Sequence, residues 1–376
     1  MKRIQFSKQK SLALKGVAIV MMMFHHCFIP GRFAESIYNV NFWPLNANRV
    51  IRIALFFKIC VSIFAFISGY GLMASFEKMY EKEQTINVNK WILKRLIKTL
   101  SGFWIVAVLS LIICQIINGQ TYEVFFHNKN IIVGIVEILF NVFGLGYLLK
   151  VQLLNGTWWY MSIAVLFICS VPILYSLIKK YGYIVTALVL ITVPRILQIP
   201  FSSESYFAFI FAVFLGMLCN DKNIIEKILN AKKYKKNKYI NKIIRFLIGT
   251  VIIFVLYKMY YYLPLNKYWE INLALIPVMV IIYLCEFFIE LPIISTVLQF
   301  LGKHSMNIFL IHTFVRAMYL TQYILLGKNF IVIAILLLLI SLVLSVLLEL
   351  LKKLVRYQNF IDYLQLKVDN YFNKYT

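Results

Sequence analysis

The chain has 376 residues, of which 61% are apolar and only 14% are charged, and its mean hydropathy is +0.79. This composition excludes an ordinary soluble globular domain, in which about a quarter of the residues are charged. The net charge of +24 is spread over segments between apolar stretches, which argues against a nucleic-acid-binding module. We therefore predict an integral membrane protein whose main partner is the lipid bilayer.

Apolar stretches recur along the chain, and crossing ~30 Å of hydrocarbon takes roughly 20 helical residues. The predicted fold is an all-α integral membrane protein with about ten transmembrane helices. These predicted spans are residues 12–30, 51–75, 96–118, 158–178, 181–200, 205–220, 243–263, 270–290, 300–322 and 329–350. Residues 131–150 are also apolar, but glycines, Glu137 and Asn141 interrupt them, so we expect a re-entrant or interfacial hairpin there.

The basic residues indicate the orientation, because short cytoplasmic loops hold the excess of lysine and arginine. With ten spans, most of the 39 basic residues lie on the same side as the two termini, which are therefore predicted to be cytoplasmic. The richest cluster falls in a loop at about 221–242, and a short basic tail covers about 352–376. We expect residues 1–376 to form a single domain in the cytoplasmic membrane.

Several familiar catalytic motifs are missing from the sequence. The six cysteines are widely scattered and lack the spacing of zinc ligands, so no metal cofactor is expected. There is also no glycine-rich phosphate loop, no HExxH pair and no GxSxG elbow. The chemistry is therefore expected within the membrane, where ionisable side chains are costly and mark candidate sites.

The strongest candidate site lies in the first predicted span. His26 stands eleven positions after Lys15, so both share one helix face and are roughly 16 Å apart along the axis. His25 points about 80° away from that face. Because imidazole can remove a proton from a hydroxyl near neutral pH, we predict that His26, with His25 beside it, is catalytic. The alternative is that both histidines only donate hydrogen bonds to neighbouring helices.

Five segments carry motifs that occur together in a known family. They are Leu14–Lys15–Gly16 with His26, Phe66–Gly71, Trp91–Lys98, Trp158–Trp159–Tyr160 with Pro172, and Leu301–His312. In this order and spacing they resemble the membrane acyltransferase-3 family, whose first helix carries an arginine, ten intervening residues and a histidine. Lys15 replaces that arginine here, and Arg95 with Lys98 replaces the family's pair of arginines.

The resemblance implies that an acyl group, usually acetyl, is taken from cytoplasmic acyl-coenzyme A. Its phosphates need cations, and the resemblance assigns that role to Lys15, Arg95 and Lys98, of which the last two share a helix face. A lysine cannot make the bidentate phosphate contact of an arginine. The alternative for Arg95 and Lys98 is that they are ordinary cationic anchors at the membrane boundary.

The implied acceptor is a hydroxyl of an extracytoplasmic or lipid-linked polysaccharide. On this interpretation His26 is the base, or it carries the acyl group covalently. Trp158, Trp159 and Tyr160 are candidates to stack on the saccharide, although they also fit an aromatic belt at the membrane surface. His312 is expected to be a buried structural imidazole.

Two other functions compete with acyl transfer. A polysaccharide or acylated-glycan transporter would also bury histidines and arginines along a path, but no two-half repeat is visible. A membrane anchor for other proteins would leave the stripe of Lys15 and His26 unexplained. If the chain is an acyltransferase, it either acts alone or passes its acyl group to a separate extracytoplasmic protein. The sequence does not indicate the oligomeric state.

Overall fold

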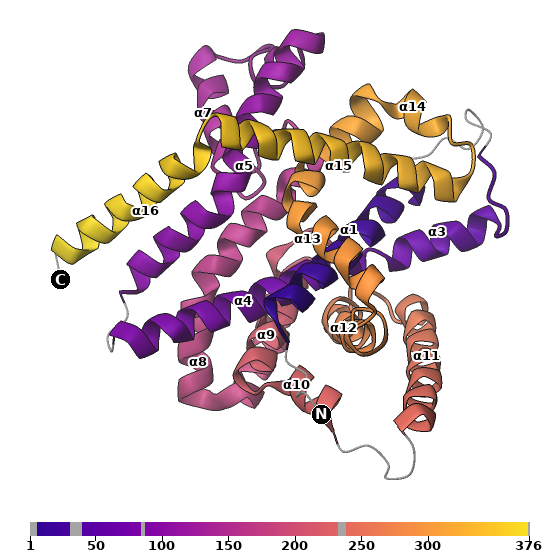
Figure 1. The fold of residues 1–376 in the computed structure, drawn as a ribbon. Coiled ribbons are helices and arrows are strands. Elements are labelled where there is room, and N and C mark those ends of the chain that lie inside the picture. The colour runs from indigo at the N-terminus through magenta and orange to yellow at the C-terminus, as the bar shows by residue number, and fades with distance from the viewer. Residues whose placement is uncertain (1–5, 31–39, 84–86, 232–237, 375–376) are drawn as a thin grey trace. The chain divides into compact units, whose positions relative to one another are not determined.

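The computed structural model describes residues 6–30, 40–83, 87–231 and 238–374 (Figure 1). The regular secondary structure in this part of the chain is helical, apart from one isolated β-bridge between Asn41 and Asn329. In chain order the elements are α1 (Lys8–Phe28), α3 (Ala47–Phe56), α4 (Ile59–Glu83), α5 (Val88–Asn118), α6 (Gln120–Phe125), α7 (Ile131–Val142), η1 (Gly156–Trp158), α8 (Trp159–Ile196), α9 (Tyr206–Asp221), α10 (Ile224–Asn230), α11 (Lys238–Tyr262), η2 (Ile271–Leu275), α12 (Ile276–Phe287), α13 (Pro292–Thr313), η3 (Phe314–Tyr319), α14 (Thr321–Leu325), α15 (Phe330–Leu354) and α16 (Tyr357–Lys374).

Local signals in the sequence explain where the key helices begin and end. The side chain of Ser7 accepts a hydrogen bond from the Lys10 backbone N–H and so caps the start of α1. Asn87 caps α5 in the same way, through the N–H of Lys90. At the other end of α5, Gly119 has a φ of 69°, a left-handed conformation that glycine adopts at low cost.

The all-helical prediction is confirmed, but ten spans are not. Six described helical segments are long and apolar enough to cross a membrane, or seven if the bent pair α9 and α10 forms one span. The boundary predicted between the spans at 158–178 and 181–200 lies close to Gly182, where the helical segment α8 is kinked. The backbone of Gly182 is not helical (φ 79°, ψ 172°), so α8 consists of two consecutive helices that meet at a kink.

Other predicted spans are shorter than expected. The stretch predicted at 270–290 contains the π-helical η2 and the twelve-residue α12, and together they remain a short apolar helix. Within the predicted hairpin at 131–150, α7 has twelve residues, about 18 Å, which is too short to cross the bilayer. The richest part of the predicted basic loop, 232–237, lies outside the described residues.

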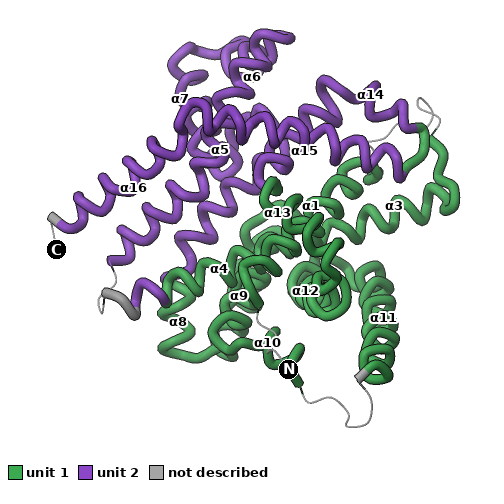
Figure 2. The backbone as a smooth tube through the Cα atoms, viewed as in Figure 1, with its two compact units in different colours: residues 1–77, 173–305, 328–330 green, residues 78–172, 306–327, 331–376 purple. Residues whose placement is uncertain are grey.

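The chain divides into two compact units (Figure 2). Unit 1 contains residues 1–77, 173–305 and 328–330, and unit 2 contains residues 78–172, 306–327 and 331–376. Four of the five boundaries fall inside α4, α8, α13 and α15, and the fifth lies between α14 and α15, so single helices contribute to both units.

In unit 1, α1 packs against α3 and α12 and crosses α13 at very short range. A Cβ atom built on Gly16 would lie 2.1 Å from the backbone oxygen of Leu298. A Cβ built on Gly302 would lie 1.8 Å from the backbone oxygen of Leu12. Two glycines therefore allow the backbones of α1 and α13 to touch, as small residues do between membrane helices.

In unit 2, an apolar core is built around α5. Phe103, Phe125 and Trp158 are almost fully buried in it. The predicted tail at 352–376 contains an 18-residue helix, α16, which the sequence analysis did not anticipate. Ile361 and Val368 of α16 pack against Ile97 of α5, and this contact holds the C-terminal helix on the first half of α5.

Candidate active site on α1 and α5

The predicted stripe of the first span lies on one continuous helix. Helix α1 carries Lys15, His25 and His26, all in unit 1. Lys15 and His26 are half-buried, whereas His25 is only 8% exposed. Because α1 is uninterrupted, the predicted rise of roughly 16 Å between positions 15 and 26 holds.

His25 has a clear structural partner in α3. Its Nδ1 atom lies 2.6 Å from the backbone oxygen of Ala54. Since a carbonyl can only accept, Nδ1–H is the donor, and a neutral ring then has its lone pair on Nε2. Ala54 belongs to the last turn of α3, where carbonyls lack an intrahelical partner, and the N–H of Lys58 bonds to Leu55 instead. His25 thus satisfies an orphan carbonyl of α3.

His26 stands beside this anchored ring. The two imidazole centroids are 5.1 Å apart, with an angle of 70° between the ring planes. His26 follows a run of three buried methionines, Met21 to Met23, on the same helix. Because the Nδ1–H group of His25 donates to the Ala54 backbone oxygen of α3, His26 is the better candidate for a catalytic role. That role stays a prediction.

The cations predicted to bind the acyl donor lie in both units. Arg95 and Lys98 are on α5 in unit 2, where Arg95 is half-buried and Lys98 is exposed. The guanidinium carbon of Arg95 is 5.9 Å from the centroid of the Trp91 ring, a cation–π contact. Lys15 belongs to unit 1, so a shared binding site for the three cations stays a prediction.

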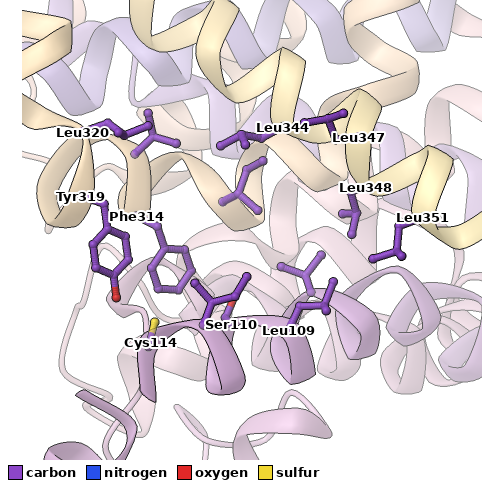
Figure 3. Close-up of a pocket in the computed structure, with 14 residues that line it drawn as sticks. Leu109, Ser110, Cys114, Phe314, Tyr319, Leu320, Leu344, Leu347, Leu348 and Leu351 are labelled. Carbon is purple, nitrogen blue, oxygen red and sulfur yellow. The ribbon is translucent and has the colours of Figure 1, made fainter. Parts of the chain in front are cut away.

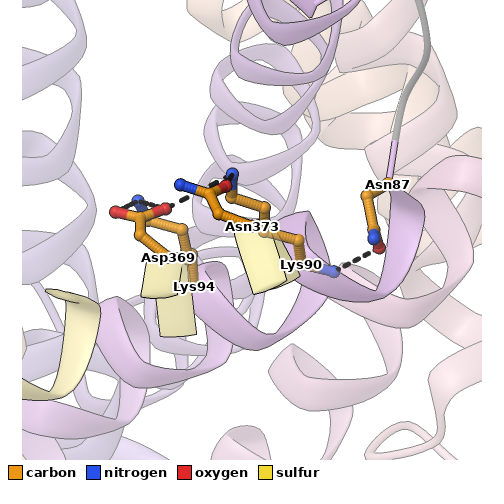
Figure 4. Close-up of polar contacts among 5 residues, drawn as sticks. All are labelled: Asn87, Lys90, Lys94, Asp369 and Asn373. Atoms are coloured by element: carbon orange, nitrogen blue, oxygen red, sulfur yellow. Dashed lines mark hydrogen bonds and ion pairs between the residues drawn. The ribbon is translucent and has the colours of Figure 1, made fainter. Parts of the chain in front are cut away.

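Two neighbouring lysines of α5, Lys90 and Lys94, bind polar side chains of α16 (Figure 4). Lys94 Nζ lies 2.8 and 2.7 Å from the two carboxylate oxygens of Asp369. Lys90 Nζ is 3.6 Å from Asp369 and 3.1 Å from the side-chain oxygen of Asn373. The Gln365 amide also donates to the backbone oxygen of Lys94. These two lysines, which precede the third predicted span, therefore serve the packing of α16 on α5.

The same carboxylate has a shifted pKa. Partial burial raises the pKa of Asp369, but the hydrogen bond and charge of Lys94, with the charge of Lys90, outweigh it. The net result is a pKa below the ordinary value for aspartate. The contact between α16 and α5 is therefore an ion pair at neutral pH.

The aromatic triplet predicted to stack on a saccharide is mostly part of the core of unit 2. Trp158 is 2% exposed, and its indole N–H donates to the backbone oxygen of Leu310 at 3.1 Å. Its ring meets Phe103 edge-to-face, with centroids 4.9 Å apart. Trp159 is also buried, whereas Tyr160 is half-buried. This packing favours a structural role for the tryptophans, and sugar stacking stays a prediction, better suited to Tyr160.

Unit 2 also contains an apolar cavity of about 340 Å³ (Figure 3). Leu109, Phe314 and Leu348 are among its walls, which come from α5, α13 with η3, and α15. The hydroxyl groups of Ser110 and Tyr319 and a thiol are its few polar groups. Such a space suits a hydrocarbon chain better than the phosphates of a coenzyme. Among the described residues, no three His, Cys, Asp or Glu side chains gather as metal ligands would.

The fold and the buried histidines define a multi-pass α-helical membrane protein with a polar site in its first span. The chain belongs to the acyltransferase-3 family: the family model, described as an acyltransferase domain, matches residues 13–350. The match begins in α1 and ends in α15, so it includes both units. Comparisons with curated proteins and with solved structures gave no match. The resemblance predicted from the sequence is confirmed, and the protein is a membrane acyltransferase.

Proposed function

We propose that this acyltransferase moves an acetyl group from cytoplasmic acetyl-coenzyme A to a hydroxyl of an extracytoplasmic or lipid-linked polysaccharide. The observation that supports this most directly is the half-buried His26, on a span that also carries Lys15. An imidazole suits proton transfer near neutral pH, and a cation nearer the start of the helix suits a phosphorylated donor. We place the protein in the cytoplasmic membrane.

The proposed step is a direct attack on the thioester. The acceptor oxygen bonds to the acetyl carbonyl carbon while His26 takes up the hydroxyl proton. The carbon–sulfur bond breaks, and the coenzyme A thiolate receives the proton from the imidazolium. The products are an acetyl ester and free coenzyme A, so the histidine is regenerated. In the variant of this mechanism with a covalent relay, His26 itself carries the acetyl group between donor and acceptor.

In this scheme His25 holds the catalytic helix in place. Its bond to Ala54 fixes α1 against α3 and so fixes the direction in which the next residue points. Arg95 and Lys98 are proposed to bind the phosphates of the donor, in competition with the interpretation that they are membrane anchors.

Vesicles that contain the purified protein distinguish an enzyme from a transporter. Acetyl-coenzyme A labelled in its acetyl group is supplied outside the vesicles, together with an oligosaccharide extract of the native envelope. An acyltransferase releases free coenzyme A and places label on the saccharide in equal amounts. If saccharide crosses the bilayer while no coenzyme A is released, the proposed transfer is wrong and the transporter is favoured.

A further inference from the structure

The apolar cavity of unit 2 is bordered by two apolar stripes on helices far apart in the sequence (Figure 3). On α5 its lining residues recur at intervals of three and four positions from Val106 to Ile113. On α15 the same spacing connects Leu344 to Leu351. Residues with this spacing share one helix face, so each stripe is about 10.5 Å long. Both faces border the space of about 340 Å³.

This cavity has a buried floor and an exposed rim. Cys114 on the floor is 1% exposed and Val315 of η3 is 2% exposed, whereas Leu347 on the rim is 55% exposed. Both α5 and α15 are long and apolar enough to cross a membrane, so their exposed apolar side chains contact the hydrocarbon of the bilayer. The cavity is therefore a groove that opens to lipid at its rim, and we call it the α5–α15 groove.

Water does not suit the α5–α15 groove. A volume of about 340 Å³ would hold on the order of ten water molecules, each of which needs two to four polar partners. The lining side chains offer two hydroxyl groups, those of Ser110 and Tyr319, and the thiol of Cys114. The Tyr319 hydroxyl already donates to the side-chain oxygen of Asn118 at 3.5 Å. An empty groove would leave its apolar walls without dispersion contacts, so an apolar occupant is favoured.

The size and charge of the groove restrict this occupant further. An α-helix with its side chains is about 10 Å wide, so a segment 10.5 Å long occupies roughly 800 Å³, more than twice the groove. A helix of a second copy of this chain can therefore cover the rim but cannot reach the floor. None of the described residues that line the groove is Lys or Arg, so a phosphorylated coenzyme finds no cation there. A single hydrocarbon chain is both narrow and uncharged.

We propose that the α5–α15 groove binds one acyl chain of a bilayer phospholipid. Phospholipids supply the hydrocarbon around the rim, so mass action favours them over a scarcer amphiphile with a similar chain. The bound chain lies against Phe314 and Leu348 and connects α5, η3 and α15 into one apolar layer. Binding stabilises the folded protein, because the unfolded chain has no such groove. It does not require the proposed acyl transfer.

Tryptophan substitutions on α15 separate the groove from the rest of the lipid-facing surface. In Leu347→Trp the larger side chain occupies the rim, and in Leu348→Trp it enters from the floor, where Leu348 is buried. Leu339→Trp is the matched control. Leu339 is 49% exposed on the same helix, more than two turns before Leu347, and does not line the groove. The midpoint of thermal unfolding without added lipid shows whether each variant folds.

A lipid titration measures binding in the full chain. Delipidated protein in detergent receives increasing amounts of phosphatidylglycerol, and the midpoint of thermal unfolding is recorded. We expect the midpoint to rise with lipid concentration in the wild type and in Leu339→Trp. The concentration that gives half of this rise should be about tenfold higher or more in Leu347→Trp and Leu348→Trp. Each CH₂ group that the indole excludes weakens binding by about fourfold.

Cross-linking locates the bound chain. In vesicles, phosphatidylglycerol with a diazirine in one acyl chain labels the residues that this chain contacts. Bulk lipid reaches the rim of the groove but not its floor, so label on Cys114 and Val315 reports a chain inside the groove. We expect label on both residues in the wild type and in Leu339→Trp, and its loss in Leu348→Trp.

Several results would overturn this assignment. An equal lipid response of the wild type and all three variants would show that the groove does not hold the chain. Label confined to the rim would exclude a chain on the floor, and a dimer that Leu347→Trp dissociates would then assign the rim to a second copy. Native mass spectrometry that finds a saccharide-bearing lipid retained in place of phospholipid would assign the groove to that lipid. The labelled-acetyl assay decides the acyl transfer separately from these measurements.

Discussion

The two adjacent histidines of α1 have different environments although the sequence presents them as a pair. His25 is almost fully buried and bonds to the last turn of α3, whereas His26 is half-buried. The periodicity of a helix predicted that they point in different directions. It could not predict the partner of His25, because that partner is a backbone oxygen left unpaired where α3 ends and the chain turns at Lys58.

Replacing His25 tests whether its hydrogen bond to the Ala54 carbonyl stabilises the protein. His25→Ala leaves the buried oxygen of Ala54 without a donor, which costs about 1–3 kcal/mol. We expect a lower midpoint of thermal unfolding in detergent for His25→Ala. His25→Asn should recover much of the loss, because its amide can donate from nearly the same position. Equal midpoints for the wild type and His25→Ala would show that the hydrogen bond does not stabilise the protein.

Contacts between helices decide how α1 is held. Gly16, which belongs to the family motif, lies where α1 crosses α13, against the backbone of Leu298. Sequence patterns identify glycine as a small residue but do not show which helix it faces, because that depends on a contact across more than 280 residues. The close crossing explains a glycine in the middle of α1, where glycine otherwise weakens a helix.

The Gly16→Ala variant should disturb this crossing. The added Cβ meets a backbone oxygen that cannot rotate away, so we expect destabilisation by about 1–3 kcal/mol and weaker transfer. Gly71→Ala in α4 is the matched control, because nothing lies within 4 Å of its built Cβ. That substitution should be neutral or stabilising by roughly 0.5–1 kcal/mol. Thermal unfolding of both variants tests the prediction, and similar effects of the two would refute it.

Helix α16 shows a different limit of sequence reasoning. Its apolar positions, which include Ile361 and Val368, follow a helical period. A basic tail was predicted there because charge, rather than periodicity, decided the interpretation. From the sequence alone, Asp369 is expected to be a surface charge. In the structure it forms ion pairs from α16 to Lys90 and Lys94 of α5.

The lowered pKa of Asp369 gives this contact a pH dependence. A depressed carboxyl pKa contributes stability above the unfolded value of about 3.9, and that contribution is lost as the pH falls through the folded pKa. We therefore expect α16 to loosen from α5 in acid, below about pH 4. At neutral pH, Asp369→Asn mimics the protonated state and should increase hydrogen exchange in α16 by up to about fivefold, since partly exposed pairs contribute about 0.2–1 kcal/mol.

A control on the same helix isolates this effect. Asp362 is exposed and bonds to Gln358 within α16, so Asp362→Asn should leave the exchange rates nearly unchanged. If Asp369→Asn and the wild type exchange at the same rate, the ion pair does not hold α16 in place.

For the molecule as a whole, composition predicted the membrane environment and the helical fold, and ordered motifs predicted the family. The number of spans was harder to predict from the sequence, because hydropathy alone does not show where an apolar segment bends or how long its helix is. The division predicted between 158–178 and 181–200 lies near the kink at Gly182 in α8, whereas the short η2 with α12 was not predicted. The candidate site was predicted by residue type on α1, while the hydrogen bond from His25 to the Ala54 backbone oxygen has no periodic signal and became visible only in three dimensions.

The most direct test compares His26→Gln with the wild type in the vesicle assay, with labelled acetyl-coenzyme A as the donor. His127→Gln is the control, because His127 is exposed and contacts Glu123 at 2.6 Å near α6. We predict that His26→Gln folds normally and loses transfer by about a hundredfold or more, while His127→Gln keeps the wild-type rate. Transfer at the wild-type rate by His26→Gln would contradict a catalytic role for the histidine of the first span.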